Sequence, residues 1–165
     1  MSGDDRGRLI GIAWRPARRA PMQTVDSVLV TKERGVEGDH KGAKFPRRAV
    51  TVLAREDWQA ALSDLGVADG ELAWTERRAN LLVEGVRLPR ALGATLRIGP
   101  VLIEVTYPTT PCSRMDEARA GLKHALYPDW RGGVTCRVLE EGRIALGDAV
   151  EIVQSPPERQ VRLPG

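Results

Sequence analysis

Short apolar stretches, many with alternating polar residues and most bounded by Gly, Pro or Asp, recur along the chain. Such stretches predict β-strands, and their number and spacing are typical of a sheet closed into a barrel or of a sandwich. The strands are expected at residues 9–14, 25–31, 49–54, 80–84, 95–98, 101–107, 134–139 and 149–153. The chain is therefore expected to be mainly β.

Two segments have a helical period instead. In residues 56–65 apolar side chains recur at i, i+3, i+4 and i+7, and Gly66 is placed to end the helix. A second helix is expected to begin at Ser113, a hydroxyl N-cap followed by Asp116, and to fade near Leu126.

The 165 residues, 42% of them hydrophobic, suit one domain, which we expect at residues 1–153. Residues 154–165 contain three prolines and no apolar period, which predicts a disordered tail. The polar N-terminus and the absence of a long apolar run predict neither a signal peptide nor a membrane helix. Two cysteines without a CxxC pair favour a reducing compartment, so a cytoplasmic location is expected.

The net charge is only +3, but the basic residues are 21 Arg and 4 Lys. Arginine forks bind phosphate or carboxylate through two hydrogen bonds, although most arginines in such a chain are expected to be solvated. Binding of nucleic acid is the least favoured function, because single-strand binders stack bases on aromatic residues and only 4% of this chain is aromatic.

Cys112 is the strongest candidate for chemistry. It lies in the segment 108–114, where two prolines disfavour both a helix and a central strand, so the thiol is expected to be exposed. A helix N-terminus and Arg114 would stabilise the thiolate, which attacks sulfur or binds a soft metal. A buried, inert thiol is the less favoured alternative. Cys136 alternates with two valines on one strand face and is expected in the core.

Three further segments contain candidate residues. Asp39 and His40 close a glycine-rich turn, where a role in proton transfer or ligand orientation and a purely structural role are equally favoured. Arg78 and Asn80 share one face at a strand entrance, which suits an anion or a charged edge strand. Residues 131–133, Arg-Gly-Gly, form a turn whose amides could approach an anion.

Taken together and in this order, residues 35–40, 77–80, Pro111 with Cys112, 131–133 and 142–150 resemble the MOSC family, the domain at the C-terminus of molybdenum cofactor sulfurases. The resemblance spans roughly residues 9–153 and is to the stand-alone bacterial members. It implies a closed β-barrel with a few short helices, related in shape to the small barrel of pyruvate kinase. It also implies a cysteine that carries persulfide sulfur or ligates molybdenum.

Cys112 occupies the position of that cysteine. By the same resemblance, the contacts to the molybdenum cofactor (molybdopterin) are expected from a small set of residues: Arg78, Asn80, Thr110, Arg131, Gly132 and Gly133. The amidoxime-reducing relatives carry an additional N-terminal barrel domain, which is not expected here. Binding of the cofactor is therefore expected to be transient.

Two functions follow from the resemblance. The first is a protein that binds molybdenum cofactor, carries sulfur as persulfide on Cys112, or does both. The second is a molybdenum-dependent reductase of N-hydroxylated compounds, in which Cys112 ligates the metal and Asp39 or His40 supplies protons. The family is also associated with pyridoxal phosphate, but no lysine for that cofactor is recognisable in this chain. Sulfur would have to come from a partner such as a cysteine desulfurase, and a reductase would need an electron-transfer partner.

Overall fold

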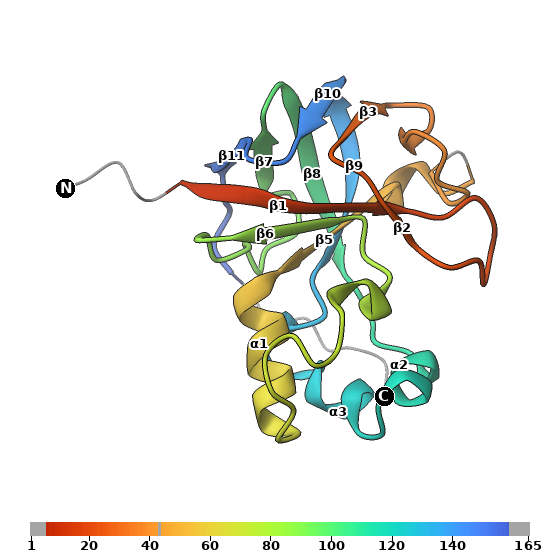
Figure 1. Ribbon diagram of the computed structural model, residues 1–165. Coiled ribbons are helices and arrows are strands. Elements are labelled where there is room, and N and C mark those ends of the chain that lie inside the picture. The colour runs from red at the N-terminus through yellow and green to blue at the C-terminus, as the bar shows by residue number, and fades with distance from the viewer. Residues whose placement is uncertain (1–5, 43, 159–165) are drawn as a thin grey trace.

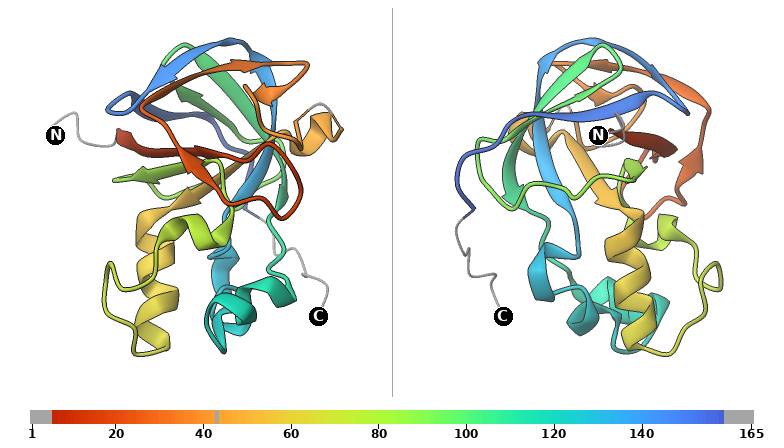
Figure 2. Two further views of the ribbon diagram at one scale, coloured as in Figure 1. Left: turned by 45° about the vertical axis from the view of Figure 1, so that its right-hand side comes forward. Right: turned by 90° about the vertical axis from the view of Figure 1, so that its left-hand side faces the viewer.

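A computed structural model describes residues 6–42 and 44–158, and it places a β-barrel above a smaller helical layer (Figures 1 and 2). Among the described residues, seven strands close the barrel. Their order is β11 (Ala149–Gln154), β7 (Thr95–Ile98), β8 (Val101–Pro108), β9 (Val134–Glu140), β5 (Val50–Ala54), β6 (Leu81–Glu84) and β1 (Gly7–Trp14). Pairing of β1 with β11 completes the circle. The expected closed barrel is confirmed.

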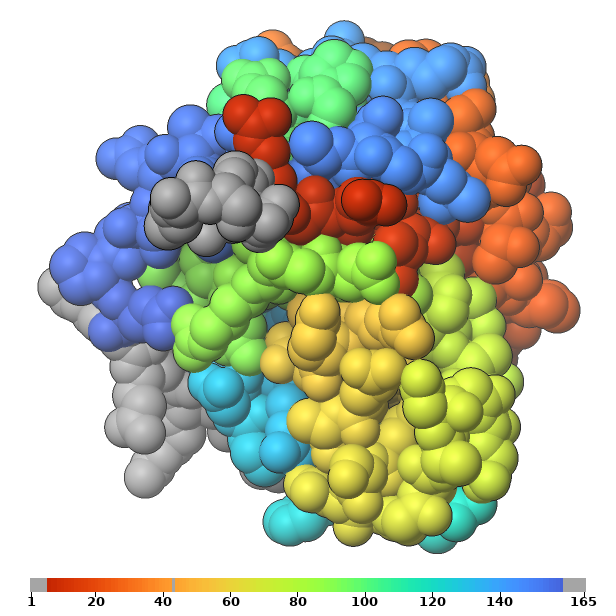
Figure 3. All heavy atoms as spheres, turned by 60° about the vertical axis from the view of Figure 1, so that its left-hand side comes forward, coloured from red at the N-terminus to blue at the C-terminus, as the bar shows by residue number. Residues whose placement is uncertain are grey.

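All neighbouring strands of the barrel are antiparallel except β5 and β6, which are parallel. A parallel pair needs a crossover connection, and the crossover here contains α1 (Arg55–Asp64) and the 3₁₀ turn η2 (Trp74–Arg77). In the space-filling view of Figure 3, yellow α1 lies below the light green β6 region and red β1. The helix packs against β5 and β6 through Leu53 and Leu82.

A second, smaller sheet adjoins the barrel. It consists of β10 (Gly142–Ala145), β3 (Ser27–Thr31) and β4 (Gly35–Val36), while β2 (Gln23–Thr24) pairs with the end of β1. The sequence pattern did not predict β10, because only Ile144 of its four residues is buried and no alternation is visible.

Two apolar cores result from this arrangement. Side chains such as Ile12, Leu96 and Ile103 fill the barrel. Cys136 is 0% exposed and belongs to the same core, as expected. Leu53 and Leu82 face outward and pack with α1 and the other helices in a second core. This is why all five residues of β5 are buried, since a strand covered on both faces reads as a continuous apolar run.

The helix predicted from Ser113 to Leu126 is divided into α2 (Ser113–Ala118) and α3 (Leu122–Ala125). The break occurs at Gly121, whose φ of 88° is left-handed and incompatible with a continuous helix. The helix predicted at 56–65 corresponds to α1. Two short 3₁₀ turns, η1 (Pro46–Arg48) and η3 (Pro128–Trp130), complete the described elements.

Within the described ranges, no helix is long and apolar enough to cross a membrane. At the C-terminal end, Glu158 accepts a hydrogen bond from Arg87 at 2.7 Å. Residues 159–165 of the predicted tail lie outside the described residues.

Candidate functional site

Cys112 lies in the loop between β8 and α2, where the barrel meets the helical layer. The amide of Thr109 donates a hydrogen bond of 2.9 Å to the carbonyl of Gly133, which ties the start of this loop to β9. The carbonyl of Cys112 accepts the amide of Met115 in the first turn of α2. The thiol is exposed and forms no disulfide. The expectation of an exposed thiol is confirmed.

The helix start differs from the expectation. Cys112, with an extended backbone, is the N-cap in place of Ser113, and no side chain caps the helix. Because α2 has only six residues, its dipole is small. Stabilisation of a negative charge near Cys112 must therefore come mainly from side chains.

Arg77 is a buried cation beside residues 109–112, the segment between β8 and α2 that is here called the cysteine loop. Its Nε donates to the carbonyl of Gly132 at 3.0 Å and its Nη2 to the carbonyl of Thr109 at 3.3 Å. The residue is only 5% exposed. Burial lowers the pKa of Arg77 to about 10, whereas its interaction with the charge of Cys112 opposes this shift. Arg77 thus holds the loop in place and puts a positive charge near the sulfur.

Arg78 and Asn80 do not share a face, because Arg78 ends η2 with a left-handed backbone (φ 66°). Asn80 is 1% exposed. Its Oδ1 accepts the amide of Thr51 at 3.0 Å and its Nδ2 donates to the carbonyl of Ala13 at 3.1 Å. The side chain of Asn80 therefore links β1 to β5 through buried hydrogen bonds. Arg78 lies elsewhere, beside the cysteine loop.

Cations from two other connections face these residues. Arg15 and Arg18 lie between β1 and β2, and Lys41 follows β4. The amide of Arg15 donates to Oδ1 of Asp39 at 3.1 Å, and the amide of His40 donates to the carbonyl of Arg15 at 3.0 Å. Burial lowers the pKa values of both Arg15 and Lys41, and neighbouring cations lower them further. Asp39 and His40 thus support the backbone that positions Arg15.

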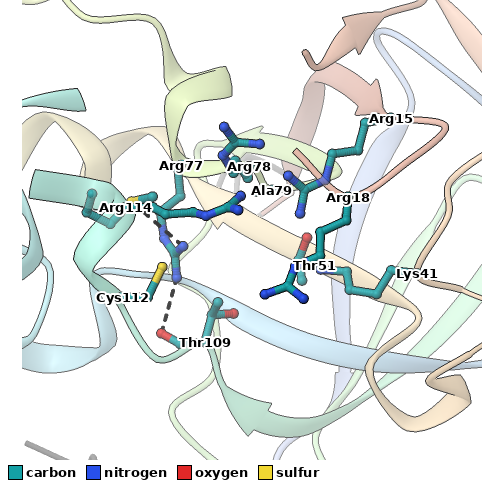
Figure 4. Close-up of a pocket in the computed structure, with 11 residues that line it drawn as sticks. Arg15, Arg18, Lys41, Thr51, Arg77, Arg78, Ala79, Thr109, Cys112 and Arg114 are labelled. Carbon is teal, nitrogen blue, oxygen red and sulfur yellow. Dashed lines mark hydrogen bonds between the residues drawn. The ribbon is translucent and has the colours of Figure 1, made fainter. Parts of the chain in front are cut away.

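These segments surround a cavity of about 260 Å³, here called the thiol cavity (Figure 4). Cys112, Met115, Thr51, Ala79 and Thr109 contribute to its wall. The remaining lining residues are cations: Arg15, Arg18, Lys41, Arg77, Arg78 and Arg114. Within the part of the chain that the structure describes, no acidic side chain lines the cavity.

Four lining residues have buried polar atoms without a hydrogen-bond partner among the described residues. The atoms are Nη1 of Arg15, Nη1 of Arg78, Nη2 of Arg114 and Oγ1 of Thr109. Buried donors without partners are uncommon and costly. Guanidinium donors form their strongest hydrogen bonds with carboxylate or phosphate oxygens. The cavity is therefore suited to an anion with several oxygen atoms next to a thiol.

A second cavity, of about 290 Å³, shares Lys41, Thr51 and Thr109 with the thiol cavity. We call it the aromatic cavity, because the half-exposed rings of Phe45 and Tyr107 contribute to its wall. Among the residues predicted to bind cofactor, Thr110 lies here and not in the thiol cavity.

The other residues predicted to contact the cofactor have structural roles, either in hydrogen bonds or in close packing. Arg131 donates to the carboxylate of Asp64 and to the carbonyl of Ala125. The carbonyl of Gly132 accepts from Arg77, as described above. Gly133 has φ 93°, and a Cβ there would lie 2.2 Å from the carbonyl oxygen of Val52. Its role in the structure is close packing of β9 against β5.

Sequence reasoning missed most of the cavity. Of the predicted site residues only Cys112 and Arg78 line it, together with Arg114, which was expected to stabilise the thiolate. Four other cations that line it were not selected: Arg15, Arg18, Lys41 and Arg77. They come from distant segments, and each alone resembles an ordinary surface cation. The high proportion of arginine was the available signal.

The fold is similar to those of solved bacterial structures. The YUAD protein from Bacillus subtilis is 14% identical with a TM-score of 0.73, and the match covers 88% of this chain and 94% of that chain. YiiM from Escherichia coli is 20% identical with a TM-score of 0.65, covering 92% and 72%. YiiM from Geobacillus stearothermophilus is 21% identical with a TM-score of 0.63, covering 90% and 73%. At these identities the likeness shows the fold.

No curated protein matches the chain. The family model of the MOSC domain matches residues 37–151, which is more than half of the 165 residues. This match includes Cys112, Arg77, Arg78 and Arg114, and it agrees with the closed barrel described above. The chain therefore belongs to the MOSC domain family.

Proposed function

We propose that the thiol cavity binds the molybdenum cofactor and that Cys112 presents a sulfur atom to it. The observation that supports this proposal most strongly is the set of buried, unpartnered nitrogen atoms of Arg15, Arg78 and Arg114 in the wall around a free thiol. Membership of the MOSC family points to the same ligand.

The residues present fit this cofactor in two respects. Its phosphate group needs several charge-assisted donors, which the guanidinium groups supply. Its metal favours a soft sulfur ligand, which Cys112 offers. Within residues 6–42 and 44–158, no group of three or more His, Cys, Asp or Glu side chains is placed to hold a metal ion. The proposal therefore requires the metal to arrive bound to the pterin.

The main lining residues then have distinct roles in binding the cofactor. Arg15, Arg78 and Arg114 neutralise the anion and fix its position, while Arg77 keeps the cysteine loop and a positive charge beside the sulfur. When bound, the cofactor would supply a metal centre that accepts a sulfur ligand. Cys112 acts either as that ligand or as a persulfide carrier. A persulfide role implies a sulfur-donating partner, and a free thiol suits the reducing cytoplasm.

The aromatic cavity favours a second candidate function, the reduction of N-hydroxylated compounds. It adjoins the thiol cavity and could hold an organic substrate between Phe45 and Thr110. Asp39 and His40, the expected proton donors, line neither cavity. Lys41 lines both, and its lowered pKa makes it the better proton donor for this reaction.

The first experiment is to measure the molybdenum and pterin contents of the full-length protein purified from cells that make the cofactor. Cys112→Ala tests the sulfur, Arg78→Gln with Arg114→Gln tests the anion site, and Cys136→Ala is the matched control for loss of a thiol. Because binding is expected to be transient, we expect metal and pterin in less than stoichiometric but equal amounts in the wild type and in Cys136→Ala. The arginine variant should lose both.

The Cys112→Ala result then separates the two roles of the thiol. Retained pterin without metal would favour Cys112 as the ligand, whereas retention of both would favour the persulfide role. Absence of pterin from the wild type would contradict binding of a retained cofactor. Turnover of N-hydroxylated substrates with a supplied electron donor would support the second candidate.

A further inference from the structure

Cys112 combines two properties that the proposed function does not fully use. Its thiol is exposed, and every charged side chain that lines the thiol cavity is cationic among the described residues. Arg77 is 5% exposed, and no carboxylate of the described ranges pairs with it. Arg78 and Arg114 each keep a buried nitrogen without a partner. A thiolate here would lie beside donors that can bind a second anion.

This arrangement restricts the reactions open to the thiolate. When a thiolate attacks a sulfur–sulfur bond, the leaving group departs as an anion, and more stable anions depart faster. Apart from the ammonium group of Lys41, no side chain that lines the cavity within the described segments is a suitable acid for a poor leaving group, since neither a carboxylic acid nor an imidazole is among them. The arginines instead stabilise a departing anion by hydrogen bonds and charge. The site therefore favours a leaving group that is itself a stable oxoanion.

We propose that Cys112 takes sulfur directly from small sulfane donors whose leaving group is an oxoanion of sulfur, with thiosulfate as the simplest member. The thiolate Sγ attacks the outer sulfur of thiosulfate and forms a new S–S bond. The original S–S bond breaks, and its electron pair leaves with sulfite. Arg78 and Arg114 bind the oxygens of thiosulfate before the attack and those of sulfite after it.

Cys112 is left as a persulfide, whose outer sulfur passes to a nucleophile such as a thiol or cyanide, and the thiolate is regenerated. This inference rests on the persulfide-carrying part of the proposed function but goes beyond it. It requires neither pterin nor metal, and it replaces a desulfurase partner with a small anion.

The test uses full-length protein from cells that cannot make the pterin. Thiosulfate and cyanide are added, and thiocyanate is measured. The wild type is expected to form thiocyanate, and with thiosulfate alone to gain one sulfur atom at Cys112 by mass spectrometry. Cys112→Ala should form none above the uncatalysed rate. Cys136→Ala, which removes the buried thiol, should retain the activity.

The anion site is tested by Arg78→Gln with Arg114→Gln, and Arg97→Gln on the outside of β7 is the matched control for loss of charge. With thiosulfate, kcat/KM of the double variant should fall about 10-fold or more, because charge-assisted hydrogen bonds to the donor are lost. With a neutral organic trisulfide the loss should stay below about 3-fold. The neutral donor thus reports any general loss of thiolate reactivity. Arg97→Gln should leave both rates unchanged.

Two outcomes would overturn the inference. One is a wild type that forms no more thiocyanate than Cys112→Ala, and the other is an equal loss with both donors in the arginine variant. Because the cofactor is absent from this assay, a negative result leaves cofactor binding untouched. Conversely, protein that binds no molybdenum can still pass this test.

Discussion

At the residue scale, several residues of the predicted site maintain the backbone around the cavity through side-chain or main-chain hydrogen bonds. The carboxylate of Asp39 accepts a hydrogen bond from the amide of Arg15, and the amide of His40 donates a hydrogen bond to the carbonyl of Arg15. Asn80 forms buried hydrogen bonds with Thr51 and with the carbonyl of Ala13. Changes at these positions are therefore expected to alter stability more directly than chemistry.

His40 gives a prediction for the pH dependence of stability. Burial, and then the charge of Arg15, lower the pKa of His40 from 6.5. The unfolded chain then binds this proton more readily, so stability is lost as the pH falls below about 6.5. From about pH 8 to about pH 5, the Tm of the wild type should fall more steeply than that of His40→Gln. His124→Gln, which removes an exposed imidazole, is the control, and parallel curves for wild type and His40→Gln would contradict the prediction.

Asn80→Ala is expected to lower the free energy of unfolding by about 2–4 kcal/mol, because it leaves the buried amide of Thr51 and the buried carbonyl of Ala13 without these side-chain hydrogen bonds. Urea unfolding measures the change. A loss below about 0.5 kcal/mol, the usual range for a surface position, would show that the network contributes little.

At the element scale, the site depends on how closely β5 approaches its neighbours. Residues of β5 pack in both the barrel core and the helical core. Gly133, in the turn before β9, lies against the carbonyl of Val52 in β5. That turn also supplies the carbonyl of Gly132 that holds Arg77. The position of the cysteine loop is therefore coupled to the packing of a glycine turn on the barrel wall.

Gly133→Ala tests this coupling, with Gly147→Ala as a matched control. Both glycines have a left-handed φ, 93° and 96°, but a Cβ at 133 meets the Val52 carbonyl at 2.2 Å whereas nothing lies within 4 Å at 147. Gly147→Ala should cost about 1–2 kcal/mol, the penalty for this backbone conformation. Gly133→Ala should cost clearly more in urea unfolding, and equal losses would refute the steric argument.

At the scale of the whole molecule, the thiol cavity forms where barrel connections meet the helical layer. Arg15, Arg18 and Lys41 approach from the barrel connections, and Cys112 and Arg114 approach from the start of α2 (Figure 4). Like charges face one another across this space. Sites arranged for a ligand commonly cost the ligand-free protein stability.

Arg114→Gln should therefore stabilise the ligand-free protein while weakening anion binding. Relief of about 0.5–1 kcal/mol of repulsion and desolvation would raise Tm by roughly 2 °C. Inorganic phosphate, bound only by the folded state, should raise the wild-type Tm more than that of the variant. Arg97→Gln, which loses an exposed ion pair with Glu140, should show neither effect. A lower Tm for ligand-free Arg114→Gln would contradict this prediction.

The sequence by itself determined the β-rich class, the buried position of Cys136 and the exposure of Cys112. Strand periodicity left a barrel and a sandwich open, and the closed barrel was expected only from the resemblance to the MOSC family. Strand periodicity and a proline-bounded loop are local properties, so they can be recognised without knowing what packs against them. Helix α1 was predicted for the same reason. These features fix the fold class and one reactive atom of the candidate site.

Only the tertiary structure decided which residues surround that atom. The left-handed backbone at Arg78 separates it from Asn80, and the left-handed Gly121 breaks the second predicted helix. Arg15, Lys41 and Arg77 meet near the cysteine loop only because distant connections converge there. A buried cation without a carboxylate is a property of its surroundings, and no local pattern of sequence contains those surroundings.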